Sequence, residues 1–380
     1  KTMSTLKVGG IRGVSASSDA ITVANDGTCS ANITNNLSNR RINHNGAMFV
    51  NQRGNVTGIT ATGYNGPDRL RTTIYGGTFS FSRGDSGSTL PEFPRCFKID
   101  CTSAASAPTG TQECKIGYDM EGDDVQQIMY GSSSAKKTTL TFYIRSNKTE
   151  TYTVWYYRTN GQRMNAVNFS VSSANTWEKK TITIDGDTSD PITNTNDSGI
   201  KFEFVLASGP GFKSGSALNG SWSDLVNVNR YVGNTGSFGQ STDDVIEITG
   251  IQFEVGSVAT DFEHRSFGEE LLKCQRYYQE VRATSITAAS SSLTRFNCPL
   301  MCEMRAEPSV GKGGSGNINV GDMVSHGSNT SSTPSSDGYS GDRLMMSCSV
   351  GGFSGLTQYR QYCHELNSDK LGLIACDAEL

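Results

Sequence analysis

From residue 44 to residue 265 the chain alternates hydrophobic and polar residues with the two-residue period of β-strands. Leu140, Phe142 and Ile144 share one face of a predicted strand, and every second residue of 200–206 is large and apolar. About ten such segments follow one another, separated by turn residues and not by helical patterns. Strands with one buried face and one solvent-exposed face are typical of antiparallel sheets. The pattern therefore predicts an all-β sandwich, and we expect a jelly roll.

The last strand of this region, residues 245–255 (VIEITGIQFEV), contains a change of phase. Ile246 and Ile248 occupy even positions, whereas Ile251, Phe253 and Val255 occupy odd ones. A side chain changes face when the two-residue period slips by one residue. Gly250 lies where the phase changes, and a glycine at such a slip predicts a β-bulge.

The pattern changes from strand to helix after the turn-like GSVATDFEHRS. Phe267, Leu271, Cys274 and Tyr278 recur at helical spacing, with charged residues between them. This spacing predicts an amphipathic helix of about three turns. We expect Phe267 and Leu271 to seat the helix against the preceding domain.

Alternating segments return after the helix and continue to the last residue, which predicts a second, smaller β-sandwich over 266–380. The first 43 residues contain only two short apolar alternations, which cannot bury a core by themselves. Such a segment gains a core by intertwining with copies of itself or by docking on a larger body; a floppy tail is the alternative. We predict three domains, namely a stalk over 1–43, the jelly roll over 44–265, and the helix with its sandwich over 266–380.

Composition supports an all-β chain and argues against several partners. The 380 residues include 42 glycines, as expected for many turns, and the net charge of −4 provides no basic surface for nucleic acid. No apolar run is long enough for a membrane span, so we expect no membrane insertion. The ten cysteines mostly occupy positions of small buried hydrophobes. Free thiols in a reducing cytosol explain them better than disulfides or a metal site.

The run GIQFEVGSVATDFEHRSFGEELLKCQRYYQ resembles a junction that recurs in tail-fibre and receptor-binding structural proteins of tailed bacteriophages. About thirty consecutive positions match in kind, and Asp261 stands where that family commonly has proline. We call this segment the joint. The resemblance implies that its His264 and Arg265 help to fix the angle between the jelly roll and the distal module. Its structural residues are predicted to be Gly250, Glu254, Gly256, His264, Arg265, Phe267, Leu271 and Tyr278.

The resemblance also implies a function. We expect a virion protein assembled in the host bacterial cytoplasm, a homotrimeric tail fibre or receptor-binding protein that adheres to a host surface glycan. The N-terminal segment would attach to other tail or head proteins, and the jelly roll is similar in outline to carbohydrate-binding modules. A head decoration fibre or another tail-associated protein is the nearest alternative. A glycan depolymerase and a cellular carbohydrate-binding module attached to an enzyme are more distant alternatives.

A ligand-binding site is predicted in the polar region of the distal module. Aromatic rings offer an apolar face to a sugar, and neighbouring amides, carboxylates and guanidinium groups bind its hydroxyls. Tyr339 lies in such a polar stretch, and binding residues commonly lie on loops. An ordinary exposed tyrosine is the alternative. The predicted ligand-binding residues are Tyr339, His326, Asn329, Asp337 and Arg343.

Other motifs indicate no covalent chemistry, and we expect the protein not to be an enzyme. The GDSG sequence around Ser86 resembles the nucleophile of trypsin-like proteases, but only His44 lies upstream as a base. The acidic runs 121–124 and 243–247 are expected to be solvated turns. We predict no cofactor and no metal site, with a structural Ca²⁺ at these acids as the alternative.

Overall fold

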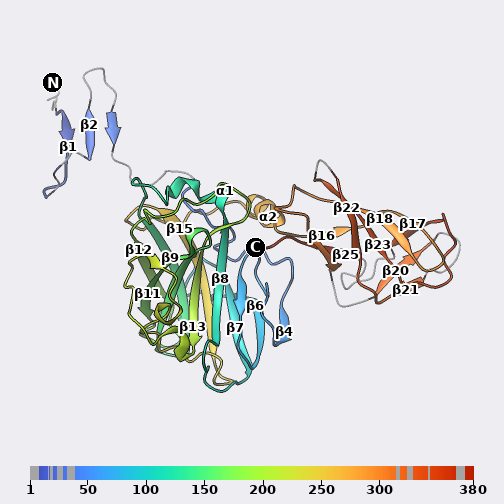
Figure 1. Cartoon of the computed structure of the whole chain (residues 1–380), viewed down its shortest axis with the longest axis horizontal. Coiled ribbons are helices and arrows are strands. Elements are labelled where there is room, and N and C mark those ends of the chain that lie inside the picture. Colours follow the sequence, from blue (N-terminus) through green and yellow to red (C-terminus); the bar gives the residue numbers. More distant parts are fainter. Residues whose placement is uncertain are drawn as a thin grey trace.

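The computed structural model describes residues 8–15, 17, 20–23, 29–31, 39–313, 317–322, 328–340, 343–364 and 373–380. The main body is a sandwich of two six-stranded sheets whose neighbouring strands are antiparallel (Figure 1). In spatial order the first sheet contains β14 (Ser223–Asp224), β11 (Arg163–Ser170), β10 (Thr151–Arg158), β13 (Ser198–Ser208), β8 (Glu113–Glu121) and β5 (Arg71–Thr73). The second contains β12 (Glu178–Ile184), β9 (Thr138–Ser146), β15 (Val245–Val255), β7 (Arg95–Ser103), β6 (Thr78–Asp85) and β4 (Val56–Ile59).

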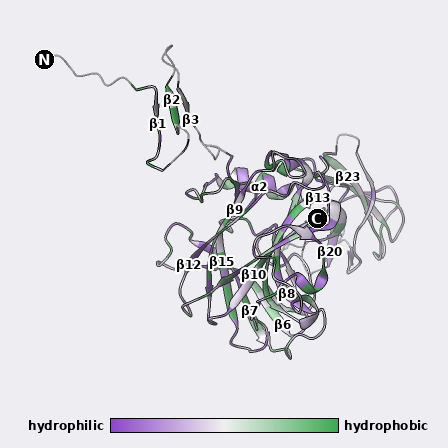
Figure 2. Cartoon of the chain, turned by 60° about the vertical axis from the view of Figure 1, so that its left-hand side comes forward, coloured by the Kyte–Doolittle hydropathy of each residue, from purple (hydrophilic) through white to green (hydrophobic). Residues whose placement is uncertain are grey.

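The core of this sandwich lies between the two sheets and confirms the predicted all-β jelly roll. Leu140, Phe142 and Ile144 on β9 are buried, and so are the apolar residues of 200–206 on β13. Figure 2 shows hydrophobic and hydrophilic residues side by side along these strands. Helices are few: α1 (Gly122–Val125), α2 (Phe267–Gln275) and the 3-10 turns Gln126–Ile128, Asn160–Gln162, Pro210–Phe212 and Asn227–Asn229.

The predicted bulge is present in β15. Its pairing with β9 shifts register between Thr249 and Gln252, and Gly250 has a φ of +61°. A Cβ at Gly250 would lie 2.9 Å from ring atoms of Phe93 and Tyr143. Both the backbone conformation and the close approach of the rings therefore favour glycine here.

The distal module contains a three-stranded and a seven-stranded sheet. The smaller sheet runs β16 (Tyr278–Arg282), β25 (Leu373–Asp377), β19 (Ser309–Lys312). The larger runs β21 (Ser328–Thr330), β20 (Ile318–Gly321), β24 (Gln361–His364), β17 (Thr284–Ala288), β18 (Thr294–Pro299), β23 (Met345–Val350), β22 (Ser335–Tyr339). Seven flat strands would be about 29 Å wide, whereas the connection 331–334 between the outermost strands spans at most about 18 Å. The larger sheet must therefore curl.

Helix α2 is shorter than predicted, and it is seated differently. It ends at Gln275, and Tyr278 lies on β16. The expectation that Phe267 seats the helix is wrong, because its side chain is 57% exposed, while Leu271 is only half-buried. The buried residues of the helix are Glu270 and Cys274. Guanidinium groups lie beneath the helix, so its inner face carries a carboxylate instead of a second apolar residue.

Polar contacts connect the distal module to the sandwich. Arg276, after α2, forms an ion pair with Glu121 at 2.7 Å, and Arg305 donates to the carbonyl of Asn196 at 3.0 Å. The hydroxyl of Tyr64 donates to the carbonyl of Leu380 at 2.7 Å. The end of the chain thus returns to the sandwich, as Figure 1 shows.

The predicted stalk over 1–43 is described only in part. Strands β1 (Gly10–Ile11), β2 (Ile21–Val23) and β3 (Cys29–Ala31) form a small antiparallel sheet. At the other end of the range, Arg41 and Asn43 are buried against β15 and α2. The boundary after residue 43 stays a prediction, and the two buried residues pack against the joint.

Candidate functional site

An open groove of about 620 Å³ lies on the seven-stranded sheet of the distal module. We call it the distal groove. Its lining residues come from four adjacent strands, β17, β18, β23 and β22: Ser285, Thr287, Arg295, Phe296, Asn297, Asp337, Ser347 and Cys348.

Strand alternation explains why the distal groove is polar. On β18 the apolar Phe296 and Cys298 are buried in the module core, so Arg295 and Asn297 point to the opposite face. On β23 the same period buries Met346 and leaves Ser347 exposed. Because one face of the sheet packs the core, its other face carries the hydroxyl, amide and guanidinium groups.

Charged and neutral groups alternate across the groove. The Nε of Arg295 lies 3.7 Å from Oδ2 of Asp337, and the Arg295 side chain is 71% exposed. The hydroxyl of Ser349 donates to Oδ1 of Asp337 at 2.8 Å, which holds the carboxylate in place. The hydroxyl of Ser347 donates to Oδ1 of Asn297 at 3.3 Å. The exposed guanidinium group can donate to the hydroxyl groups of a ligand, and the carboxylate beside it can accept from them.

An irregular strand pairing borders one side of the groove. The pairing of β17 with β18 shifts register between Thr284 and Thr287, and Ser285 in this interval has a φ of +53°. A left-handed residue within a strand bends it locally. The bend lies at the edge of the groove, where Ser285 and Thr287 contribute to the lining.

The structure separates the residues predicted to bind a ligand. Asp337 lines the distal groove, whereas the hydroxyl of Tyr339 is engaged by the backbone: it donates to the carbonyl of Arg343 at 3.0 Å and accepts from the amide of Met304 at 3.3 Å. Burial raises the pKa of Tyr339. Tyr339 packs partly against the module core, which supports a structural role.

The other predicted residues do not join Asp337 in the distal groove, although the backbone of Arg343 contacts Tyr339. Arg343 forms an exposed ion pair with Glu303 at 3.0 Å, and Asn329 lies on β21, at the far end of the strand order from β22. His326 lies outside the described residues. The sequence analysis missed three groove residues, Arg295, Asn297 and Ser347. The alternation of polar and apolar residues on β18 and β23 could have indicated the polar face that carries them.

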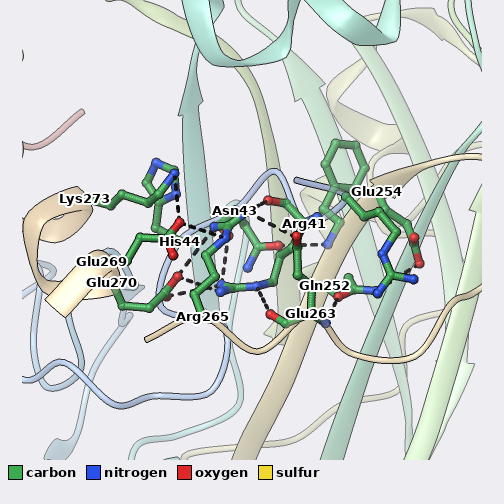
Figure 3. A network of polar contacts seen from close by, with 12 residues as sticks. Arg41, Asn43, His44, Gln252, Glu254, Glu263, Arg265, Glu269, Glu270 and Lys273 are labelled. Carbon is green, nitrogen blue, oxygen red and sulfur yellow. Dashed lines mark hydrogen bonds and ion pairs between the residues drawn. The ribbon is translucent and has the colours of Figure 1, made fainter. Parts of the chain in front are cut away.

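Two of the predicted joint residues, Glu254 and Arg265, belong to a dense polar network with Arg41, Gln252, Glu263 and Glu270, which were not predicted (Figure 3). Arg41 pairs with Glu270 at 2.6 Å, and both side chains are almost fully buried. Arg265 lies 3.5 Å from the same carboxylate and donates to the carbonyl of Arg41. Burial alone would raise the pKa of Glu270, but the charge and hydrogen bonds of Arg41, helped by Arg265, lower it below its ordinary value.

The remaining joint residues hold the turn between β15 and α2. Buried Glu254 accepts from the amide of Thr260 at 2.9 Å and from its hydroxyl at 2.6 Å. The amide of Gly256 donates to the carbonyl of Lys137 at 2.8 Å. The ring of His264 stacks on Phe93, with centroids 5.6 Å apart. Each contact fixes the path of the chain between the two modules.

The expectation that the acidic runs are solvated turns is wrong for Glu121, Asp244 and Glu247, which are buried. They also do not provide a calcium site that fits. Glu121 is held by Arg276, Asp244 by Lys148 at 2.8 Å, and Glu247 by Arg145. Oxygen atoms already neutralised by protein cations are poor ligands for Ca²⁺. Among the described residues, no group of three or more His, Cys, Asp or Glu side chains could hold a metal ion.

Two further sequence features have structural explanations. Ser86 of the GDSG sequence is fully buried, and its hydroxyl donates to the carbonyl of Phe93. The nine described cysteines whose side chains are placed are free, and Cys298 and Cys348 are among those buried in the distal core. In the part of the chain that the structure describes, no helix has the length and apolarity needed to cross a membrane.

No family model matches the sequence, and no curated protein matches it. Several solved structures match this chain at low similarity. One is the enzymatically active domain of tailspike protein 4 from bacteriophage CBA120, at 12% identity and a TM-score of 0.28, covering 57% of this chain and 21% of that chain. Another is a putative sugar-binding protein from Bacteroides thetaiotaomicron, at 15% identity and a TM-score of 0.30, covering 57% of this chain and 100% of that chain.

A third is the CBM22-1 and GH10 module pair of xylanase 10B from Clostridium thermocellum in complex with xylohexaose. It has 11% identity and a TM-score of 0.28, covering 59% of this chain and 30% of that chain. This chain thus spans about a fifth of the tailspike chain and all of the Bacteroides protein.

Proposed function

We propose that this chain is a bacteriophage virion protein that binds a host surface glycan through the distal groove. The observation that carries the binding proposal is the groove itself, where Arg295, Asn297 and Asp337 line one open polar face. Glycans present many hydroxyl groups and few charges. A row of alternating donors and acceptors on a rigid sheet suits such a ligand.

The virion part of the proposal depends on the joint sequence, which resembles junctions in phage tail fibres and receptor-binding proteins. The joint network supports this reading, because buried pairs such as Arg41 with Glu270 hold the distal module in a fixed direction. A fixed direction suits an adhesin, which must present its binding face outward. Several copies on one virion would gain avidity from individually weak sites.

Binding without hydrolysis suits the groove better than depolymerase activity. Glycosidases use two carboxylic acids about 5 to 10 Å apart across the scissile bond. Of the groove-lining residues in the described regions, Asp337 is the single carboxylic acid, and Arg295 lies beside it. Incubation with host polysaccharide should therefore release no reducing ends; their release would overturn the adhesin proposal.

Substitution of one groove residue tests glycan binding. The full chain should bind host cells or their extracted surface polysaccharide, and Arg295→Ala should weaken this binding about tenfold or more, because a charge-assisted hydrogen bond is lost. Arg343→Ala is a matched control, since Arg343 is an exposed arginine of the same module, paired with Glu303 outside the groove lining. Equal binding by Arg295→Ala and the unsubstituted chain would exclude the groove.

Two measurements test the assembly and the virion location. The proposed fibre is a homotrimer attached through its N-terminal segment, so light scattering should give three times the mass of one chain. A clean monomer would contradict the stalk. Antibody labelling of virions would then separate a tail fibre from a head decoration fibre, the nearest alternative.

A further inference from the structure

A second pocket lies in the other module, on the outer face of the sheet that contains β9 and β15. We call it the joint socket. It is lined by Glu92, Thr141, Tyr143, Lys179, Gly250, Gln252, Thr260, Asp261 and Phe262. Its volume is about 40 Å³, which is room for about three water-sized groups. It is therefore far too small for a whole sugar ring, but it can hold a hydroxymethyl group.

The bulge of β15 shapes this socket. The absence of a Cβ at Gly250 lets the rings of Phe93 and Tyr143 approach the bulge, and a Cβ there would lie 2.9 Å from their atoms. The hydroxyl of Thr141, on the neighbouring strand β9, belongs to the lining and is buried without a hydrogen-bond partner. A buried hydroxyl without a partner is costly, and a ligand or a water that supplies one removes that cost.

The mouth of the socket carries polar groups that the described protein leaves unengaged. Within the described ranges, neither the carboxylate of Asp261 nor the hydroxyl of Tyr143 has a hydrogen-bond partner. The ammonium group of Lys179 lies 5.8 Å from the centre of the Tyr143 ring. Burial raises the pKa of Tyr143, and the nearby carboxylates of Glu92 and Asp261 raise it further. The carboxylates of Glu92 and Asp261, the ammonium group of Lys179 and the phenol of Tyr143 thus lie at the mouth of the socket.

We propose that the joint socket binds the exocyclic hydroxymethyl group of a neutral hexose. The hydroxymethyl enters toward Thr141, while the ring lies at the mouth against Tyr143 and Phe262, whose faces suit the C–H groups of a sugar. Asp261 accepts hydrogen bonds from ring hydroxyls, and Lys179 donates one. Because two carboxylates and one ammonium group line the socket, uronic acids and other anionic sugars are disfavoured.

This inference takes its ligand class from the function proposed above, but it concerns different residues in a different module. Saturation-transfer NMR on the full chain tests it, with methyl α-glucopyranoside, methyl β-galactopyranoside and glucuronic acid as probes. We expect saturation of a methyl hexoside, strongest at the C6 protons, and none of glucuronic acid. Thr141→Val should lower the affinity about five- to tenfold without lowering the melting temperature, since its hydroxyl has no protein partner.

Two further variants separate the joint socket from the distal groove. Asp261→Leu should lose hexoside binding, whereas Asp243→Asn, at an exposed aspartate in another turn of the sandwich, should keep it. Arg295→Ala should also keep it, even if it abolishes adhesion to host cells. The proposal would be overturned if glucuronic acid bound as well as the hexosides, or if Thr141→Val and Asp261→Leu left binding unchanged. It would also be overturned if ordered water were the sole occupant of the socket.

Discussion

Arg69 of the jelly roll and Glu379, one residue before the last, form an ion pair in which both side chains are almost fully buried. Arg53 approaches the same carboxylate at 3.3 Å. The guanidinium group of Arg69 also lies over the ring of Tyr277, 3.3 Å from its centre, and donates to the carbonyl of Asp119 at 2.7 Å. The end of the chain therefore fastens the distal module to the sandwich through charge.

Removal of this carboxylate should destabilise the protein strongly. Glu379→Ala leaves the buried Arg69 without its counter-ion, and breaking a buried pair from one side costs about 3–5 kcal/mol. Urea-induced unfolding would measure the loss. The control is Glu303→Ala, which removes an exposed pair with Arg343 and should change stability by less than about 1 kcal/mol. Similar losses in the two variants would show that the chain end does not fasten the modules.

Acid should weaken the joint through Glu270. Its pKa in the folded protein is lowered below the ordinary 4.5, because Arg41 and Arg265 outweigh the effect of burial. The stabilisation it provides is therefore fully present above about pH 4.5 and is lost as the pH falls through the lower folded pKa. Melting temperatures of the wild type and Glu270→Gln, measured from pH 7 to pH 3, should differ most at neutral pH and converge in acid.

The neighbouring acid on the same helix provides the control for this pH effect. Glu269 is 45% exposed and lies 3.7 Å from Arg265 and 4.0 Å from Lys273; exposed pairs contribute little, so Glu269→Gln should change the melting temperature much less than Glu270→Gln does. A gap between wild type and Glu270→Gln that stays constant from pH 7 to pH 3 would contradict the assignment of the charge to Glu270.

Sequence patterns predicted the elements of the fold where one face of a strand is apolar. The alternation through Phe142 and the slip at Gly250 depend on local periodicity, and both are confirmed. The seat of α2 was missed because it depends on Arg41, more than two hundred residues away from Glu270. Periodicity favoured Phe267, since an apolar residue in phase is normally buried, and no local signal marks a buried carboxylate.

The residues of the candidate site were also hard to predict, because their positions depend on long-range contacts. Asp337 and Tyr339 are close in sequence, yet Asp337 lines the distal groove and Tyr339 supports the backbone near Met304. Asn297 joins Asp337 because β18, β23 and β22 are neighbours in the sheet. Strand order is set by long-range pairing, which the residues of a single sequence do not display.

The bulge at Gly250 should tolerate no side chain. Gly250→Ala places a Cβ 2.9 Å from the rings of Phe93 and Tyr143 in a left-handed conformation, which should cost about 2 kcal/mol or more. Gly268→Ala in α2 is the opposite case, because no atom lies within 4 Å of the position that its Cβ would take. Alanine favours a helix, so this variant should be as stable as the wild type or up to about 1 kcal/mol more stable. Thermal unfolding measures the stability of both variants. If the bulge were dispensable, Gly250→Ala would be as stable as Gly268→Ala.

Tyr339→Phe should separate a structural tyrosine from a ligand-binding one. The hydroxyl of Tyr339 connects the amide of Met304 to the carbonyl of Arg343, so its removal should destabilise the distal module by about 1 kcal/mol. Host-glycan binding should stay at the wild-type level, because the ring packs partly against the module core while Asp337 and Arg295 line the groove. Unfolding and glycan binding are measured on the same preparation. If Tyr339→Phe were as stable as the wild type but bound glycan more weakly, Tyr339 would be a binding residue. That result would contradict the structural role that its two hydrogen bonds indicate.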